Sequence, residues 1–106
     1  MLKSKMLMIQ GTTSGAGKSV VVTALCRILS NRGYKVAPFK SQNMSSMMHV
    51  TDESKRVVAK AQAIQAVASR IKPTPDMNPI LLKPIGNYES RVYVKGKFFD
   101  TMNAQQ

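Results

Sequence analysis

The chain is poor in cysteine, in tryptophan and in acidic residues. Its 106 residues include one cysteine, no tryptophan, and 5 aspartates and glutamates against 16 lysines and arginines. A single cysteine, Cys26, excludes an internal disulfide and a CxxC metal site, and it fits a reducing compartment. The shortage of acids leaves a formal net charge of +11, which favours anionic partners such as phosphates, polycarboxylates or nucleic acid.

Long apolar runs are also missing. The run at 6–9 is shorter than the core of a signal peptide, which has about 7–15 residues. No stretch approaches the roughly 20 apolar residues of a membrane span. The basic residues are spread from Lys3 to Lys97, and there is no helix-turn-helix or RNA-binding motif. We therefore expect a cytoplasmic chain that binds neither membrane nor nucleic acid.

Composition nevertheless predicts a folded core. Hydrophobic residues make up 43% of the chain and charged residues 20%, whereas disordered segments combine low hydrophobicity with high charge. The length allows one domain at most, because single domains commonly have roughly 100–150 residues.

The apolar residues alternate between strand-like and helix-like spacing. Short apolar runs bounded by glycine or proline predict strands, and apolar residues three or four positions apart predict helices. We expect a buried strand at 6–9, a strand at 34–40, a loop at 41–49, a short strand at 80–82 and a last strand at 91–99 with a turn at Gly96. The first expected helix covers 17–32 and ends at Gly33, with one apolar face made of Val21, Leu25, Ile28 and Leu29. The second expected helix is N-capped by Thr51, with one apolar face made of Val57, Ala61, Ile64, Ala68 and Ile71.

This alternation predicts an α/β fold with a mostly parallel sheet. Flanking helices would make it a three-layer structure. Because only a few strands are expected, such a sheet would leave an exposed edge and an uncovered face. We therefore expect residues 1–106 to be the N-terminal portion of a larger domain, a truncated gene product, or a chain that forms a homodimer.

The segment "GTTSGAGKS", from Gly11 to Ser19, lies between the first expected strand and the first expected helix. It ends like the phosphate-binding loop G-x-x-x-x-G-K-[ST], but its first glycine stands one position too early. In such loops backbone N–H groups surround the phosphates, the lysine adds charge, and the hydroxyl binds Mg²⁺. Lys18 in the first helical turn would be unfavourable at the positive end of the helix dipole unless an anion lay there. We interpret the segment as a nucleotide site rather than a turn that binds nothing.

"GTTSGAGKS" resembles the G-T-x-S-x-A-G-K-S variant of this loop in the synthetase part of the cobyric acid synthase family, a P-loop NTPase family related to dethiobiotin synthetases and MinD/ParA-like proteins. In that variant the first glycine stands six positions before the second, as it does here. Further blocks look like those of the family in the same order: "VAPFKSQNMS" at 36–45, "AKAQAIQAVAS" at 59–69, "PDMNPILLKP" at 75–84 and "VYVKGK" at 92–97.

The resemblance implies an amidoligase reaction in cobalamin biosynthesis. Its cofactors would be ATP and Mg²⁺, its nitrogen donor glutamine, and its substrate a corrinoid polycarboxylate, (adenosyl)cobyrinic acid a,c-diamide. The γ-phosphoryl group of ATP would activate a carboxylate, and ammonia would attack the acyl phosphate. Cations stabilise the negative charge that develops in both steps.

The resemblance also assigns roles to residues of this chain. As catalytic residues, Lys18 would contact the β- and γ-phosphate oxygens, and Lys40, at the end of the second expected strand, would face the carboxylate. Ser19 would bind Mg²⁺ through its hydroxyl. ATP would lie against Thr12, Thr13, Ser14, Gly15, Ala16, Gly17, Lys18 and Ser19, and the substrate against Gln42, Asn43, Gln62, Asn78 and Lys83.

Every residue outside the loop also has a purely structural interpretation. By position alone, Lys40 is an exposed lysine at a strand end, and Gln62 is a surface glutamine of a helix. The remaining candidates would be loop-stabilising amides (Gln42, Asn43, Asn78) or a solvated charge (Lys83).

The chain departs from the family at two places. Val57 stands where the family carries an acid, and "NMSSMMHV" at 43–50 replaces an Asn-Met-x-Leu-Asn-Ser-like stretch. The family's proteins also have a glutaminase domain with a nucleophilic cysteine, which is not encoded in these residues. Cys26 lies within the first expected helix, where we expect a small core residue, and His49 has no cysteine placed to form a dyad with it.

Two other functions compete with this interpretation. A MinD/ParA-like ATPase switch typically has a second lysine early in the loop, which "TSGAGKS" lacks. A dethiobiotin synthetase-like ligase lacks a block like "DMNPILLKP".

Overall fold

The computed structural model describes residues 5–12, 17–51 and 55–103 of the chain. It contains two α-helices and a mixed sheet, which agrees with the α/β class. In chain order the elements are α1 (Lys18–Asn31), β1 (Gln42–Met44), β2 (Met48–Val50), β3 (Val57–Ala59), α2 (Lys60–Ala68), the 3₁₀ turn η1 (Pro75–Met77), β4 (Ile80–Pro84), β5 (Glu89–Val94) and β6 (Lys97–Asn103).

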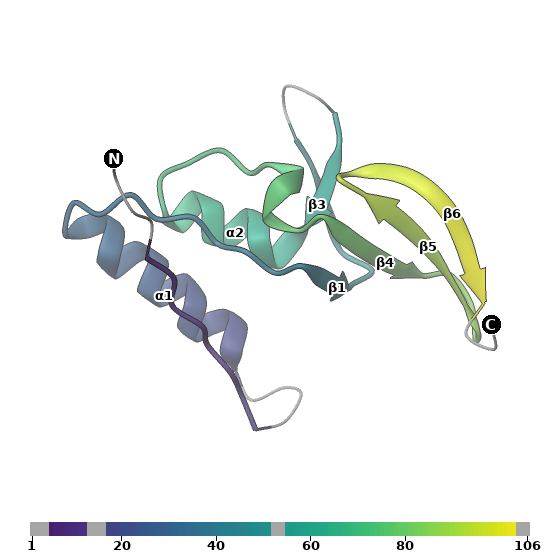
Figure 1. Cartoon of the computed structure of the whole chain (residues 1–106), viewed down its shortest axis with the longest axis horizontal. Coiled ribbons are helices and arrows are strands. Elements are labelled where there is room, and N and C mark those ends of the chain that lie inside the picture. Colours follow the sequence, from purple (N-terminus) through teal and green to yellow (C-terminus); the bar gives the residue numbers. More distant parts are fainter. Residues whose placement is uncertain (1–4, 13–16, 52–54, 104–106) are drawn as a thin grey trace.

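The strands form two sheets (Figure 1). Four strands pair in the order β1-β4-β5-β6, and β2 pairs with β3 in a separate hairpin. The β1–β4 ladder is parallel, whereas β4–β5, β5–β6 and β2–β3 are antiparallel. The described residues therefore do not form the mostly parallel sheet that we expected, because short connections join β4 to β5 and β5 to β6, and parallel strands need long crossovers.

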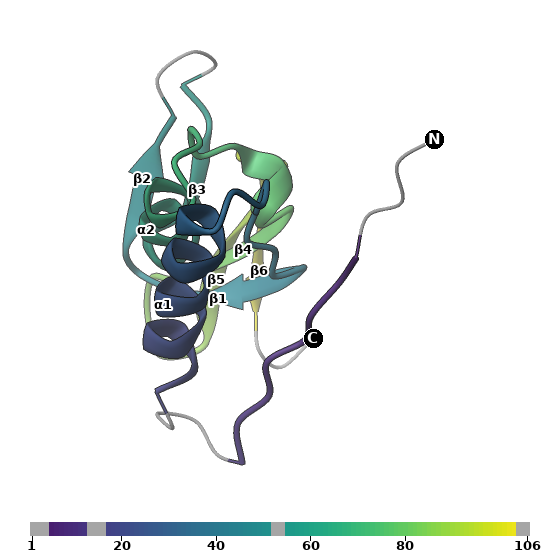
Figure 2. The same cartoon turned by 90° about the vertical axis from the view of Figure 1, so that its left-hand side faces the viewer.

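Two expected strands do not form. Residues 6–9 and 34–40 have no strand assignment, and Met6 and Met8 are 97% and 75% exposed. Figure 1 shows the first of these segments drawn over α1 rather than over either sheet, and Figure 2 shows it standing apart from that helix. An extended segment becomes a strand only by pairing with a neighbour, and none of the described strands lies beside it.

The first helix forms as predicted. It begins after Gly17 and ends at Asn31, and Gly33 follows with a φ of 90°, the left-handed conformation of a helix C-terminus. Its buried residue is Cys26, as expected, whereas Val21 and Ile28 of the predicted apolar face remain 48% and 47% exposed. Because α1 packs against α2, it buries only the narrow face that meets this helix.

The second helix begins later than predicted and buries a different face. Val57–Ala59 form β3, and the Thr51 hydroxyl bonds Arg56 N and O across the hairpin turn instead of capping a helix. Of the predicted apolar face, Ala68 is buried as expected, whereas Ile64 and Ile71 are 49% and 37% exposed. The side that α2 buries carries small or amide side chains: Gln62, Ala63, Gln65, Ala66 and Ala68.

The predicted strand at 80–82 and the turn at Gly96 are confirmed, although residues 91–99 belong to two strands rather than one. Lys95 and Gly96 have φ values of 48° and 79°, as in the tight turns that join hairpin strands. Gly96 is buried, and its carbonyl accepts a 3.0 Å hydrogen bond from Val57 N. The turn thus connects the larger sheet to β3.

The segment expected as a loop at 41–49 contains β1 and the beginning of β2. No helix within 5–12, 17–51 and 55–103 is long and apolar enough to span a bilayer.

Candidate functional site

The first turn of α1 has the features of an anion site. Gly17 precedes it in the left-handed conformation (φ 85°, ψ 19°), and within the described residues no side chain caps the helix and no acid stands in its first turn. Lys18 and Ser19 are exposed there. Uncapped N–H groups at the positive end of the helix dipole favour a negatively charged ligand.

The remaining loop residues are less fully described. Thr12 is exposed, and Thr13, Ser14, Gly15 and Ala16 lie outside the described residues, so their predicted ATP contacts stay predictions. A Cβ added to Gly17 would meet nothing within 4 Å. The glycine therefore serves backbone conformation rather than close packing.

Lys40 has a fixed backbone and an exposed side chain. Its N–H donates to Met77 O (2.9 Å), and its carbonyl accepts from Asn78 Nδ2 (2.9 Å). Its Nζ donates to Asn43 Oδ1 at 3.3 Å. Lys40 thus lies at the amino end of β1 and not, as predicted, at the carboxyl end of a strand over 34–40, in which Pro38 offers no N–H for pairing.

Three side-chain amides connect Lys40 to α1; we call Asn43, Gln62 and Gln65 the amide chain. Asn43 Nδ2 donates to Gln62 Oε1 (3.0 Å), and Gln62 Nε2 donates to Gln65 Oε1 (3.5 Å). Gln65 Nε2 then donates to the carbonyl of Ser19 at 3.4 Å. Gln62 and Gln65 are only 4% and 3% exposed. The predicted residues Lys40, Asn43, Gln62 and Ser19 are therefore parts of one hydrogen-bonded connection, and the interpretation of Gln62 as a surface glutamine is wrong.

Sequence reasoning missed Gln65. It stands three positions after Gln62, the spacing that places two residues on the same side of a helix. That spacing was the available signal, but the predicted apolar face included Ile64, which the structure leaves 49% exposed.

Asn78 is 1% exposed and acts on the backbone around Lys40. Its Nδ2 donates to Lys40 O (2.9 Å) and to Ile80 O (3.1 Å), while its Oδ1 has no partner within the part of the chain that the structure describes. These contacts are those of a loop-tying amide, and a substrate contact by Asn78 stays a prediction.

The structure does not bring Gln42 or Lys83 to the amide chain. Gln42 lies exposed on β1, and its side chain points to the opposite face from that of its neighbour Asn43. Lys83 lies on β4 in register with Arg91, which places two cations opposite each other. Neither residue shares a described hydrogen bond with these groups, and their predicted substrate contacts stay predictions.

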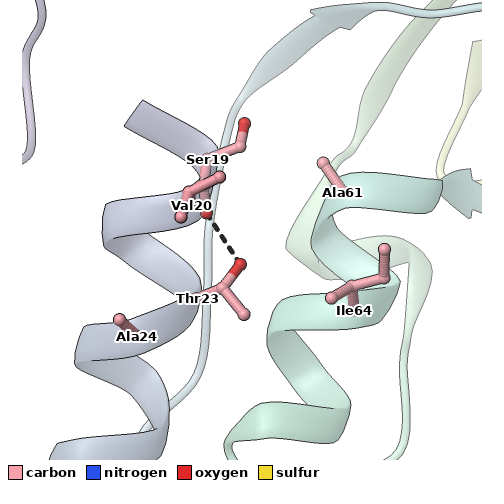
Figure 3. A pocket seen from close by; sticks show the side chains of 6 residues that line it. All are labelled: Ser19, Val20, Thr23, Ala24, Ala61 and Ile64. Atoms are coloured by element: carbon pink, nitrogen blue, oxygen red, sulfur yellow. Dashed lines mark hydrogen bonds between the residues drawn. The ribbon is translucent and has the colours of Figure 1, made fainter. Parts of the chain in front are cut away.

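An open apolar groove lies between α1 and α2, next to Ser19 (Figure 3). The Thr23 hydroxyl on α1 donates to Ser19 O at 2.7 Å, as the dashed line shows. Two side chains, Thr23 and Gln65, therefore hold this carbonyl in addition to the helix itself. The groove is lined by Ser19, Val20, Thr23, Ala24, Ala61 and Ile64.

The other candidates for chemistry lie elsewhere. Cys26 is buried in α1, His49 is exposed on β2, and Val57, where the resemblance predicts an acid, begins β3. Among the residues with described positions, no three histidine, cysteine or acidic side chains gather into a metal site. A Mg²⁺ ion held by one protein oxygen, phosphates and waters needs no such cluster.

Comparison with known proteins adds to this geometry. The family model described as the CobQ/CobB/MinD/ParA nucleotide binding domain matches residues 7–100. The cobyric acid synthase of Thermodesulfovibrio yellowstonii is 52% identical over 95% of the chain, and a probable cobyric acid synthase of Methanothermobacter thermautotrophicus is 54% identical over 98%. The chain spans 20% of the length of both relatives. No solved structure gives a significant match.

Proposed function

Because the chain belongs to the CobQ/CobB/MinD/ParA nucleotide-binding domain family, we propose that it is the ATP-binding part of an amidoligase of the cobyric acid synthase type. The reaction would amidate carboxylate side chains of a corrinoid polycarboxylate in cobalamin biosynthesis, with ATP and Mg²⁺ as cofactors and glutamine as nitrogen source. The observation that carries this proposal is the identity of 52% and 54%, over almost the whole chain, to relatives with that name.

The residues at the start of α1 fit ATP with Mg²⁺. Backbone N–H groups of the first turn and the Lys18 ammonium would neutralise phosphate oxygens, and no carboxylate in the described first turn opposes them. The exposed Ser19 hydroxyl would supply the single protein oxygen that a phosphate-bound Mg²⁺ needs. Bound in this way, ATP supplies the phosphoryl group that activates a carboxylate.

Lys40 would hold the carboxylate being activated. Its backbone is fixed on both sides by Met77 and Asn78, so the exposed ammonium projects from a rigid base. The hydrogen bond from Nζ to Asn43 further restricts the side chain. Such preorganisation lowers the reorganisation needed when negative charge develops on the reacting groups.

We also propose the features that complete this enzyme. Residues 6–9 and 34–40 would be strands of a three-layer, mostly parallel sheet in the complete domain, and a glutaminase domain not encoded in these residues would supply ammonia. The complete enzyme would be cytoplasmic, and the chain alone would cover its exposed edge by forming a homodimer.

A chimera tests the proposed reaction. The matching region of the Thermodesulfovibrio yellowstonii enzyme, which is 52% identical, is replaced by residues of this chain, and ATP- and glutamine-dependent amide formation on a corrinoid acid is measured. We expect the chimera to be active and its Lys40→Ala variant to lose at least about 100-fold in rate, the scale of a lost charge-stabilising group. A folded chimera that binds ATP but forms no amide would contradict the proposal.

A further inference from the structure

Gln65 is a buried amide placed between the two helices. It is 3% exposed, and its neighbours on the buried side of α2 include Ala66, at 0% exposure, and Ala63, at 4%. Its Nε2 reaches the Ser19 carbonyl on α1, and its Oε1 accepts from Gln62. The amide nitrogen of Gln65 is thus bound to the nucleotide side of the predicted site, at Ser19, and its amide oxygen to the substrate side, at Gln62.

These contacts orient groups more than they stabilise the fold. The two hydrogen bonds are 3.4 and 3.5 Å long, longer than the roughly 2.7–3.2 Å of most N–H···O bonds, so each contributes little to stability. An apolar side chain of the same size would avoid the desolvation of a buried amide altogether. The amide of Gln65 donates a hydrogen bond that orients the Ser19 carbonyl, and an apolar side chain cannot do this.

The position of that carbonyl matters for the proposed function. Ser19 carries the hydroxyl assigned to Mg²⁺ and follows Lys18, so a shift of its backbone moves both groups. From Gln65 the connection continues through Gln62 and Asn43 to the Lys40 ammonium. The amide chain therefore spans the distance between the residues proposed to hold ATP and the residue proposed to hold the carboxylate.

On the basis of the proposed function, we propose that Gln65 is a positioning residue. It sets the first turn of α1, and with it the Ser19 hydroxyl, for Mg²⁺-dependent nucleotide binding. The Thr23 hydroxyl holds the same carbonyl from within α1, but of the side chains that the structure describes only that of Gln65 ties it to α2 and thereby to Lys40.

The test separates Mg²⁺-dependent from Mg²⁺-independent binding in the 106-residue chain. Isothermal titration calorimetry measures the ATP affinity of wild type, Gln65→Met and the control Val67→Leu, each with Mg²⁺ and with EDTA. Val67 is 61% exposed on the same helix. Methionine matches the length of glutamine and adapts to irregular space, but it donates no hydrogen bond.

We expect Gln65→Met to weaken Mg·ATP binding about tenfold, to change ATP binding in EDTA less than about twofold, and to leave the urea unfolding midpoint near that of the control. Gln65→Leu gives the same comparison if the methionine variant does not fold. An unchanged Mg·ATP affinity, or an equal loss with and without Mg²⁺, would overturn the positioning role while leaving nucleotide binding intact. A wild-type chain that binds no ATP would overturn the proposed function as well.

Discussion

At the scale of single residues, Gly96 and Asn78 show how the chain fixes backbone near its candidate site. The Asn78 amide donates hydrogen bonds to the carbonyl of Lys40, just before β1, and to the carbonyl of Ile80, the first residue of β4. The Gly96 carbonyl accepts a hydrogen bond from Val57 N. Both residues fix the course of the backbone.

Gly96→Ala should destabilise the fold strongly. A Cβ at Gly96 would lie 2.5 Å from Arg56 Cβ and 2.8 Å from Val57 O, and the φ of 79° disfavours any other residue. Left-handed strain and overpacking together predict a loss of about 2–4 kcal/mol in the free energy of unfolding, measured by urea denaturation.

Gly86→Ala is the matched control, because a Cβ there would meet nothing within 4 Å. We expect its effect to stay within about 0.5 kcal/mol, the usual range for a surface substitution. Equal stabilities of the two variants would contradict the described contact between the hairpin turn and β3.

At this scale the sequence singled out four residues that the structure joins by hydrogen bonds. Ser19, Lys40, Asn43 and Gln62 come from three of the blocks that carried the resemblance. Gln65 stands three positions after Gln62, which places the two glutamines on the same side of α2, but this spacing does not show whether that side is buried. Its role depends on where α1 packs, which is a tertiary property.

At the scale of elements, prediction succeeded where local signals decide. Gly17 and Gly33 lie at the two ends of α1, Pro79 precedes β4 and Pro84 ends it, and Gly96 closes the hairpin of β5 and β6. Prediction failed at Val57–Ala59, because this apolar triplet fits either a helix or a buried strand. Its pairing with β2 makes it a strand.

The buried face of α2 is tested by adding volume to it. Ala66 is 0% exposed, so Ala66→Leu has no room and should lower the free energy of unfolding by about 1–3 kcal/mol. Ala24→Leu, the same change on the exposed side of α1, should cost less than about 0.5 kcal/mol. Urea denaturation of both variants gives the comparison, and a larger loss for Ala24→Leu would show that the helices pack through other faces.

At the scale of the whole molecule, the chain leaves much apolar surface uncovered. Met6, Leu7 and Met8 are 70–97% exposed, and Phe39, in the other segment expected as a strand, is 69% exposed. Whether such a segment becomes a strand depends on neighbours, which the local sequence does not specify. The large-scale arrangement of the sheet was therefore the part of the fold that sequence patterns predicted least well.

The net charge of +11 also acts at this scale, because it attracts any polyanion to the surface. Binding of ATP alone would not separate a built phosphate site from this general attraction. Two lysine variants that lose the same charge distinguish a specific phosphate site from general attraction. One lysine lies in the first turn of α1 and the other on the exposed strand β6.

The most direct test is calorimetric titration of Mg·ATP into wild type, Lys18→Ala and Lys97→Ala at physiological ionic strength. We expect binding by wild type, an affinity at least about tenfold weaker for Lys18→Ala, as for the loss of a charge-assisted contact, and an unchanged affinity for Lys97→Ala. No binding by wild type, or an equal loss in the two variants, would contradict a nucleotide site at the start of α1.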